Sequence, residues 1–81
     1  MMRYILKAFV DDHHRYYQTC VLLSNNDIRI FWHDDENHAQ PLNEDQKDIL
    51  IPILEELGFT DVSEIKVSDE FTQSEYRIEY I

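Results

Sequence analysis

Hydrophobic and polar residues alternate along the first third of the chain, which is typical of strands with one buried face. The alternation predicts strands over residues 3–10, 15–23 and 28–33, separated by "DDHH" at 11–14 and "SNND" at 24–27. In the second turn, Asn25 and Asn26 suit the positive φ of a two-residue hairpin loop. Together these segments predict a three-stranded antiparallel meander.

The register of both hairpins is predictable, because a one-residue slip would turn every side chain to the opposite face. The expected pairs are Leu23 with Ile28, Val21 with Ile30 and Thr19 with Trp32 in the second hairpin, and Val10 with Arg15, Ala8 with Tyr17, Leu6 with Thr19 and Tyr4 with Val21 in the first. All of these residues then share one face, which is the predicted core face of the sheet.

A helical period replaces the alternation after Pro41 and predicts one amphipathic helix with both ends marked. Asn43 is the expected N-cap, Gln46 completes a capping box three residues later, and Gly58 is the expected C′ residue. The stripe expected to cover the sheet consists of Ile49, Leu50, Ile53, Leu54 and Leu57. Pro52 removes a hydrogen bond inside the helix, so we expect a kink or a split into two short pieces there.

Two further alternating segments, residues 63–67 and 75–81, predict a hairpin around "SDEFTQS". The element order is then β-β-β-α-β-β, which is an α+β fold with one amphipathic helix packed on an antiparallel sheet. Residues 1–81 are expected to form a single compact α+β domain, because 81 residues are too few for a second one. A chain of this length also leaves little room for a deep substrate cavity.

Charge and cysteine content narrow the function classes. Seventeen acids against seven bases give a net charge of −10, which repels nucleic-acid backbones and anionic membrane surfaces. Cys20 is the only cysteine, so an intramolecular disulfide and a CxxC site are both excluded. Neither a signal peptide nor a membrane-spanning segment is expected. We therefore expect a cytoplasmic protein.

Residues of the metal-binding type gather in "DDHH" and in "HDDENH" at 33–38. The expected register brings His13 and His14 close to His38 and sets Tyr16 opposite Asp35. Imidazole and carboxylate groups together suit Zn²⁺, Mn²⁺ or Ni²⁺. The candidate metal ligands are His13, His14, Asp35 and His38; a solvated acidic loop is the plainer alternative, and no bound cofactor is expected.

The predicted helix carries carboxylates along one side. Glu44, Asp48 and Glu55 lie within an arc of about 40° around the helix axis, with Asp45 and Glu56 beside them. Solvated helix faces usually interleave lysines with acids, but only Lys47 is nearby here. One interpretation is that this side of the helix only faces water. The other is that it binds a basic partner, because like charges without lysines between them favour one. The predicted partner-binding residues are Asp34, Asp35, Glu36, Glu44, Asp45, Asp48, Glu55 and Glu56.

The sheet face opposite the predicted core is also apolar. The expected register places six residues on it: Ile5, Phe9, Tyr16, Cys20, Leu22 and Phe31. One helix cannot cover both faces of a sheet, and a contiguous exposed apolar area usually marks an interface. Homodimerisation through this face is the plainest expectation. Binding of a partner and burial under the C-terminal hairpin are the alternatives.

No catalytic constellation accompanies these surfaces. Cys20 has no evident activating neighbour, and a single glycine cannot build a Gly-rich phosphate loop. We therefore expect a binding protein, not an enzyme.

In size and charge the chain is similar to the small acidic inhibitors of phages and mobile elements, such as anti-CRISPR and anti-restriction proteins, some of which mimic nucleic acid. That likeness implies inhibition of a basic, nucleic-acid-handling partner. An antitoxin or immunity protein against a basic nuclease, and a metal-binding or metal-sensing protein, are the alternatives.

Overall fold

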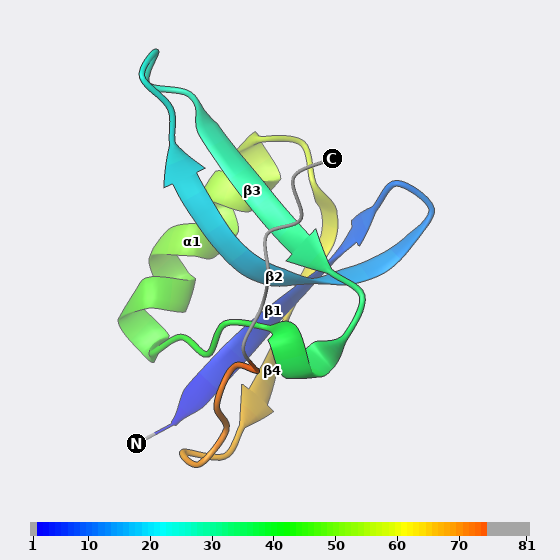
Figure 1. Ribbon diagram of the computed structural model, residues 1–81, viewed down its shortest axis with the longest axis vertical. Helices are drawn as coiled ribbons and strands as arrows, with labels where there is room; N and C mark the ends of the chain where they lie inside the picture. Colours follow the sequence, from blue (N-terminus) through cyan, green and yellow to red (C-terminus); the bar gives the residue numbers. More distant parts are fainter. Residues whose placement is uncertain (1, 75–81) are drawn as a thin grey trace.

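Over residues 2–74, a four-stranded antiparallel sheet curls around one helix (Figure 1). The computed structural model describes residues 2–74. The elements in chain order are β1 (Arg3–Val10), β2 (His13–Leu22), β3 (Ile28–His33), the short 3₁₀ helix η1 (Glu36–His38), α1 (Glu44–Glu56) and β4 (Thr60–Val67). The strand order is β3-β2-β1-β4. The α+β class and the three-stranded meander are confirmed, whereas the strand predicted over residues 75–81, and with it the C-terminal hairpin, lies outside the described residues.

The first hairpin is tighter than predicted. Its turn consists of Asp11 and Asp12, and Asp11 adopts a φ of 63°, which an aspartate tolerates better than most residues. The pairs are Ala8 with Arg15, Phe9 with His14 and Val10 with His13. The expected register is therefore wrong by two residues. Side chains alternate with a period of two, so this shift leaves the predicted core face of β1 unchanged.

The second hairpin has a three-residue loop, residues 24–26, in place of the predicted two-residue loop. Leu23 donates its N–H to Asp27 and accepts one from Asn26, and Asn26 has a φ of 67°. The strand pairs next to the loop are Leu22 with Ile28, Val21 with Arg29, Cys20 with Ile30 and Thr19 with Phe31. The predicted register is wrong by one residue here, because the loop contains one residue more.

A β-bulge at Gln18 reverses the effect of that slip. The register shifts between Tyr17 and Thr19, and Tyr17 pairs with Trp32. Both of these aromatic residues face α1, as predicted, and pack in the core. Between the bulge and the loop the faces are exchanged, so Cys20 and Leu22 face α1, whereas Thr19 and Val21 face away.

The segment between η1 and α1 fills the space where β1 and β2 separate. Leu42 exchanges two backbone hydrogen bonds with Tyr4 of β1, at 2.7 and 2.8 Å, and Gln40 donates to the Tyr17 carbonyl of β2 at 3.0 Å. These bonds satisfy backbone groups that a flat sheet would pair across the two strands. They also fix the position from which α1 begins.

The predicted ends of α1 are confirmed. The Asn43 side chain accepts from the Gln46 N–H at 2.8 Å, and the Gln46 side chain accepts from the Asn43 N–H at 2.9 Å, which together form a capping box. Gly58 follows the helix with a φ of 98°, a conformation that favours glycine. The helix runs unbroken through Pro52, so the expected split into two pieces is wrong.

The buried side of α1 differs from the predicted stripe. Leu54 has no exposed surface and Lys47 is only 8% exposed, whereas Ile49 is 66% and Leu57 48% exposed. Leu50 and Ile51 complete the sheet-facing side and pack against a core cluster with these members: Leu6, Tyr17, Leu42 and Leu54. The prediction is therefore wrong for Ile49 and Leu57, because the helix is rotated to bury the stem of a lysine.

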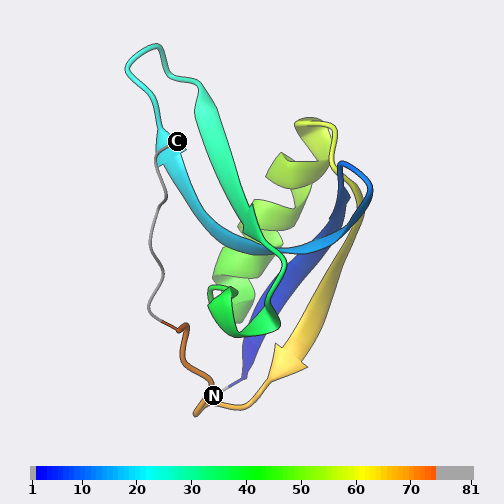
Figure 2. The same ribbon diagram turned by 45° about the vertical axis from the view of Figure 1, so that its right-hand side comes forward.

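Residues 71–74 cover part of the sheet face that points away from α1. Residues 71–74 are tied down by bonds from Arg3 to the Phe71 carbonyl at 3.0 Å and from the Gln73 amide to the His38 carbonyl at 2.9 Å. Figure 2 shows this segment running beside β4 and η1. Ile5, which points to this face, has no exposed surface.

Candidate functional site

Lys47, the one base of α1, is turned toward the sheet. Its ammonium lies 2.8 Å from Glu64 of β4 and 2.9 Å from Asp48, and it sits 4.8 Å from the centre of the Tyr4 ring. The hydrogen bonds to Glu64 and then to Asp48 raise the pKa of Lys47 above its ordinary value. The charge of Lys47 is therefore already neutralised within the fold.

The carboxylates of α1 point to solvent. All five are exposed: Glu44, Asp45, Asp48, Glu55 and Glu56. Within residues 2–74, Asp48 is the one member of this set that has an ion-pair partner. Glu44 and Glu56 stand at opposite ends of the helix, roughly 18 Å apart by the rise of an α-helix. Over residues 2–74, the result is an acidic surface along the whole of α1 with no free cation on it.

The two His/Asp segments do meet at one end of the sheet, as predicted. His13 Nε2 lies 2.8 Å from Asp34, and Arg15 Nε lies 3.3 Å from the same carboxylate oxygen. Arg15 Nε also lies 3.1 Å from His13 Nε2. Because Asp34 is the closer of the two partners of His13 Nε2 and an ionised carboxylate can only accept, His13 donates to Asp34. This hydrogen bond, opposed by partial desolvation and assisted by the nearby bases, lowers the pKa of Asp34 from its ordinary value.

The four candidate metal ligands are engaged in different local contacts. Asp35 caps η1 by accepting from the Asn37 N–H at 2.9 Å, and His38 stacks on His33 with ring centres 4.1 Å apart. His14 lies against Phe9 instead, 5.5 Å between ring centres. Over the described part of the chain, no three His, Cys, Asp or Glu side chains are grouped so that they could hold a metal ion. The predicted pairing of Tyr16 with Asp35 is also wrong, since Tyr16 pairs with His33.

These contacts change the character of the predicted 34–36 acidic turn. Asp34 is paired with bases and Asp35 is occupied as a helix cap, so of the three acids Glu36 has neither role. It is exposed in the first turn of η1. In Figure 1, η1 and the beginning of α1 lie toward the same end of the molecule.

The six residues predicted to form an apolar interface do not share one surface. Ile5 is buried, and Cys20 and Leu22 face α1 because of the register slip. Besides the buried Ile5, three residues remain on the outer face: Phe9, Tyr16 and Phe31. The prediction that these six residues form one continuous face is therefore wrong.

Exposed apolar residues occur elsewhere, at Ile28, Ile49 and Leu57, which were expected in the core, and at Leu22, which was expected on the outer face. Leu22 is 69% and Ile28 41% exposed at the end of the β2–β3 hairpin, and Ile49 and Leu57 are exposed on α1. The i, i+4, i+8 spacing of Ile49, Ile53 and Leu57 was visible in the sequence. That spacing alone could not separate a buried stripe from an exposed one.

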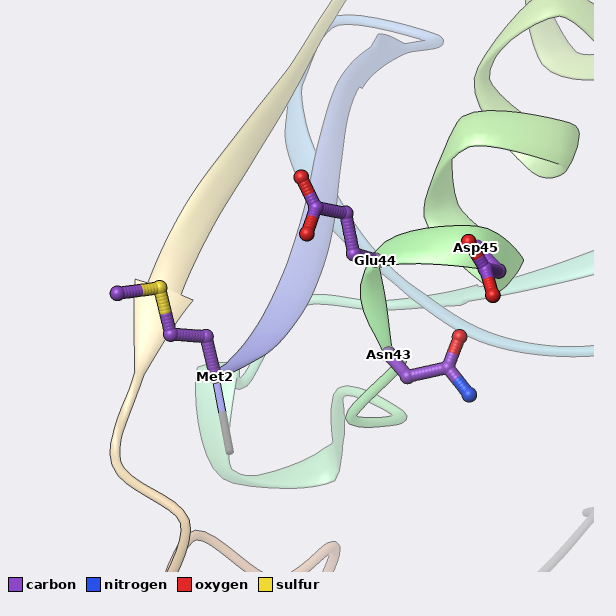
Figure 3. A pocket seen from close by; sticks show the side chains of 4 residues that line it. All are labelled: Met2, Asn43, Glu44 and Asp45. Carbon is purple, nitrogen blue, oxygen red and sulfur yellow. The ribbon is translucent and has the colours of Figure 1, made fainter.

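An open pocket of about 420 Å³ lies where β1 begins beside the first turn of α1, lined by Met2, Asn43, Glu44 and Asp45. Figure 3 shows Met2 and Glu44 on one side of it and Asn43 and Asp45 on the other. The Asn43 side-chain oxygen is already used as the helix cap. The two carboxylates of the lining, Glu44 and Asp45, both belong to the first turn of α1.

Comparison with models of protein families, with curated proteins and with solved structures finds no match for this chain. Within the described residues, none of the helices has the length and apolar character needed to cross a membrane.

Proposed function

We propose that this protein is a small acidic inhibitor, of the kind encoded by phages or mobile elements, that occupies the surface of a basic, nucleic-acid-handling partner in the cytoplasm. The observation behind the proposal is the charge arrangement of α1. Its carboxylates are exposed along the whole helix, while its one base, Lys47, is held by Glu64. Charge on this face is thus left for a partner to neutralise.

The mechanism is competition by occupation. Glu44, Asp45, Glu55 and Glu56 take the place of phosphates in a lysine- and arginine-lined groove, and Glu36 adds a carboxylate from η1. The helix spans roughly the length of five base pairs along a duplex axis. A net charge of −10 speeds encounter with a basic surface and disfavours direct binding to nucleic acid. The mechanism needs no bond-making step and no cofactor.

The first experiment identifies the partner. Immobilised protein is exposed to lysate of its host at about 50 mM and about 200 mM salt, because phosphate-like contacts weaken steeply over that range. A basic nucleic-acid enzyme retained at low salt and released at high salt is the expected result. A nuclease toxin as that enzyme would make the chain an immunity protein. Recovery of the protein alone would contradict the proposal.

The second experiment locates the inhibitory surface with matched charge variants. The helix variant combines Glu44→Gln, Asp45→Asn, Glu55→Gln and Glu56→Gln; the control variant combines Asp11→Asn, Asp12→Asn, Asp61→Asn and Glu70→Gln, which are exposed acids outside α1. Both lose the same formal charge. The helix variant should inhibit nucleic-acid binding by the recovered partner about tenfold less well or worse, whereas the control should change inhibition much less. Equal losses would show that net charge, not this face, is responsible.

A further inference from the structure

A row of apolar residues runs along α1 beside its carboxylates and lies outside the core. The row consists of Ile49, Ile53 and Leu57, spaced four residues apart on α1 and therefore neighbours along one line of the helix surface. Ile49 is 66% and Leu57 48% exposed, and Ile53 is half-buried. The residues that bind α1 to the sheet lie beside this row, not in it.

Carboxylates line the solvent side of the row. Asp45 and Glu56 lie about 40° and about 20° from Ile49 around the helix axis, both on the side away from the sheet. Both are exposed and, within the described residues, have no ion-pair partner. A molecule that covered the apolar row would therefore bring its own flank against two carboxylates.

The row faces the half of the sheet that contains β2 and β3. Asp48 and Ile53 are on opposite flanks of the sheet-facing side of α1, and Asp48 shares the Lys47 ammonium with Glu64 of β4. The acidic flank thus borders β4, which leaves the apolar row on the side of β3.

The β2–β3 hairpin also exposes apolar residues. Leu22 and Ile28 pair across its end, face the α1 side of the sheet and are 69% and 41% exposed. Figures 1 and 2 show the hairpin reaching past the C-terminal end of α1. The α1 row and this hairpin thus both expose apolar side chains on the α1 side of the sheet.

We propose that the apolar row of α1 binds an amphipathic helix of the partner whose apolar stripe is bordered by lysines or arginines. Residues at i, i+4 and i+8 form a ridge that fits between the side chains of a second helix. The carboxylates beside the ridge select a basic flank and disfavour an acidic one. A second copy of this chain fits poorly, since it would bring the same carboxylates and another −10 charge. This inference rests on the proposed function in one respect, namely that the partner is basic.

The test uses the full chain and a synthetic peptide of leucine and lysine. In the first peptide, the leucines recur at the helical period and form one stripe; in the second, the same residues are scrambled so that no stripe forms. Titration of ¹⁵N-labelled protein should show the ordered peptide binding about tenfold more tightly than the scrambled one, with amide shifts centred on residues 49–57. Equal affinities would mean attraction by charge alone and would overturn the proposal.

Matched variants separate the row from general stickiness. Ile49→Gln with Leu57→Gln should weaken binding of the ordered peptide about tenfold or more, whereas Met2→Gln with Val21→Gln, two exposed apolar residues outside the row, should leave it nearly unchanged. Circular dichroism and melting curves confirm that each variant folds. Unaltered binding by the row variant would overturn the proposal. So would a sedimentation result in which the free protein is a dimer that the row variant dissociates.

The two proposals fail in different experiments. If the carboxylate variant of α1 still inhibits the partner fully, the nucleic-acid competition is wrong, but binding of the ordered peptide to the row is untouched. If the row variant binds that peptide as well as the native chain does, the docking surface is wrong, but the competition remains.

Discussion

The ammonium of Lys47 lies 2.8 Å from Oε2 of Glu64, which joins the buried side of α1 to the edge strand β4. Lys47 occupies a helix position that faces the sheet, and only 8% of its surface is exposed. Its methylene stem contributes to packing while its charge is paired. The same contact uses the one base of α1, so that the outer carboxylates have no lysine of their own helix beside them, and it turns Ile49 to solvent. Both proposed binding features thus follow from how one lysine is buried.

The coupling between Lys47 and Glu64 can be measured directly. In a double-mutant cycle of Lys47→Met and Glu64→Gln, the free energy of unfolding is measured in urea for both single variants and the double variant. The loss in the double variant should differ from the sum of the two single losses, because each single variant already removes the contact. The control cycle pairs Lys47→Met with Glu55→Gln, an exposed carboxylate of the same helix that does not contact Lys47. That second cycle should be close to additive. A coupling of equal size in both cycles would contradict the geometry.

Leu54 and Ile49 should respond very differently to truncation. Leu54 has no exposed surface and belongs to the core cluster, so Leu54→Ala should lower the free energy of unfolding by about 2 to 5 kcal/mol. Ile49 is 66% exposed, so Ile49→Ala should change it by no more than about 0.5 kcal/mol. Urea denaturation of both variants tests the rotation of α1. Comparable losses would restore the stripe expected from periodicity.

The parts of the fold that were predictable are those that local chemistry determines. Alternation located the first three strands, because each has one buried face. Asn43, Gln46 and Gly58 marked the ends of α1, because capping depends on a few adjacent residues. The meeting of the "DDHH" and "HDDENH" segments also followed from sequence, since consecutive hairpins bring them to the same end of the sheet. The neighbour predicted for His13 was His38, however, and the observed one is Asp34.

The errors in register and in side-chain orientation arose where a single residue changed the placement of many others. A three-residue loop instead of a two-residue loop slipped the register, and the bulge at Gln18 then corrected it. No periodicity marks a bulge, so Cys20 and Leu22 were assigned to the wrong face. The burial of Lys47 was not predicted, because its partner, Glu64, lies on a strand distant in sequence. The acidic side of α1 was predictable, but the apolar row beside it was not.

The capping box of α1 predicts a moderate loss on removal of its cap. Asn43→Ala deletes the acceptor of the Gln46 N–H, so the free energy of unfolding should fall by about 1 kcal/mol. Gln46→Ala deletes the reciprocal acceptor but leaves the N-cap side chain in place, and should cost less. Thermal unfolding of the two variants gives the order. A larger loss for Gln46→Ala would show that the cap does not act as described.

The contact between His13 and Asp34 predicts a specific pH dependence. Its hydrogen bond lowers the pKa of Asp34, so the folded state binds the proton less tightly than the unfolded state, whose aspartate pKa is about 3.9. The resulting stabilisation is complete above about pH 4 to 5 and is lost as the pH falls through the folded-state pKa. Urea unfolding of the native chain and Asp34→Asn should therefore differ at neutral pH and converge in acid. Asp12→Asn, an exposed acid of the first turn, reports the effect of removing a charge alone. If the native chain instead became more stable relative to Asp34→Asn as the pH falls, Asp34 would destabilise the fold when ionised.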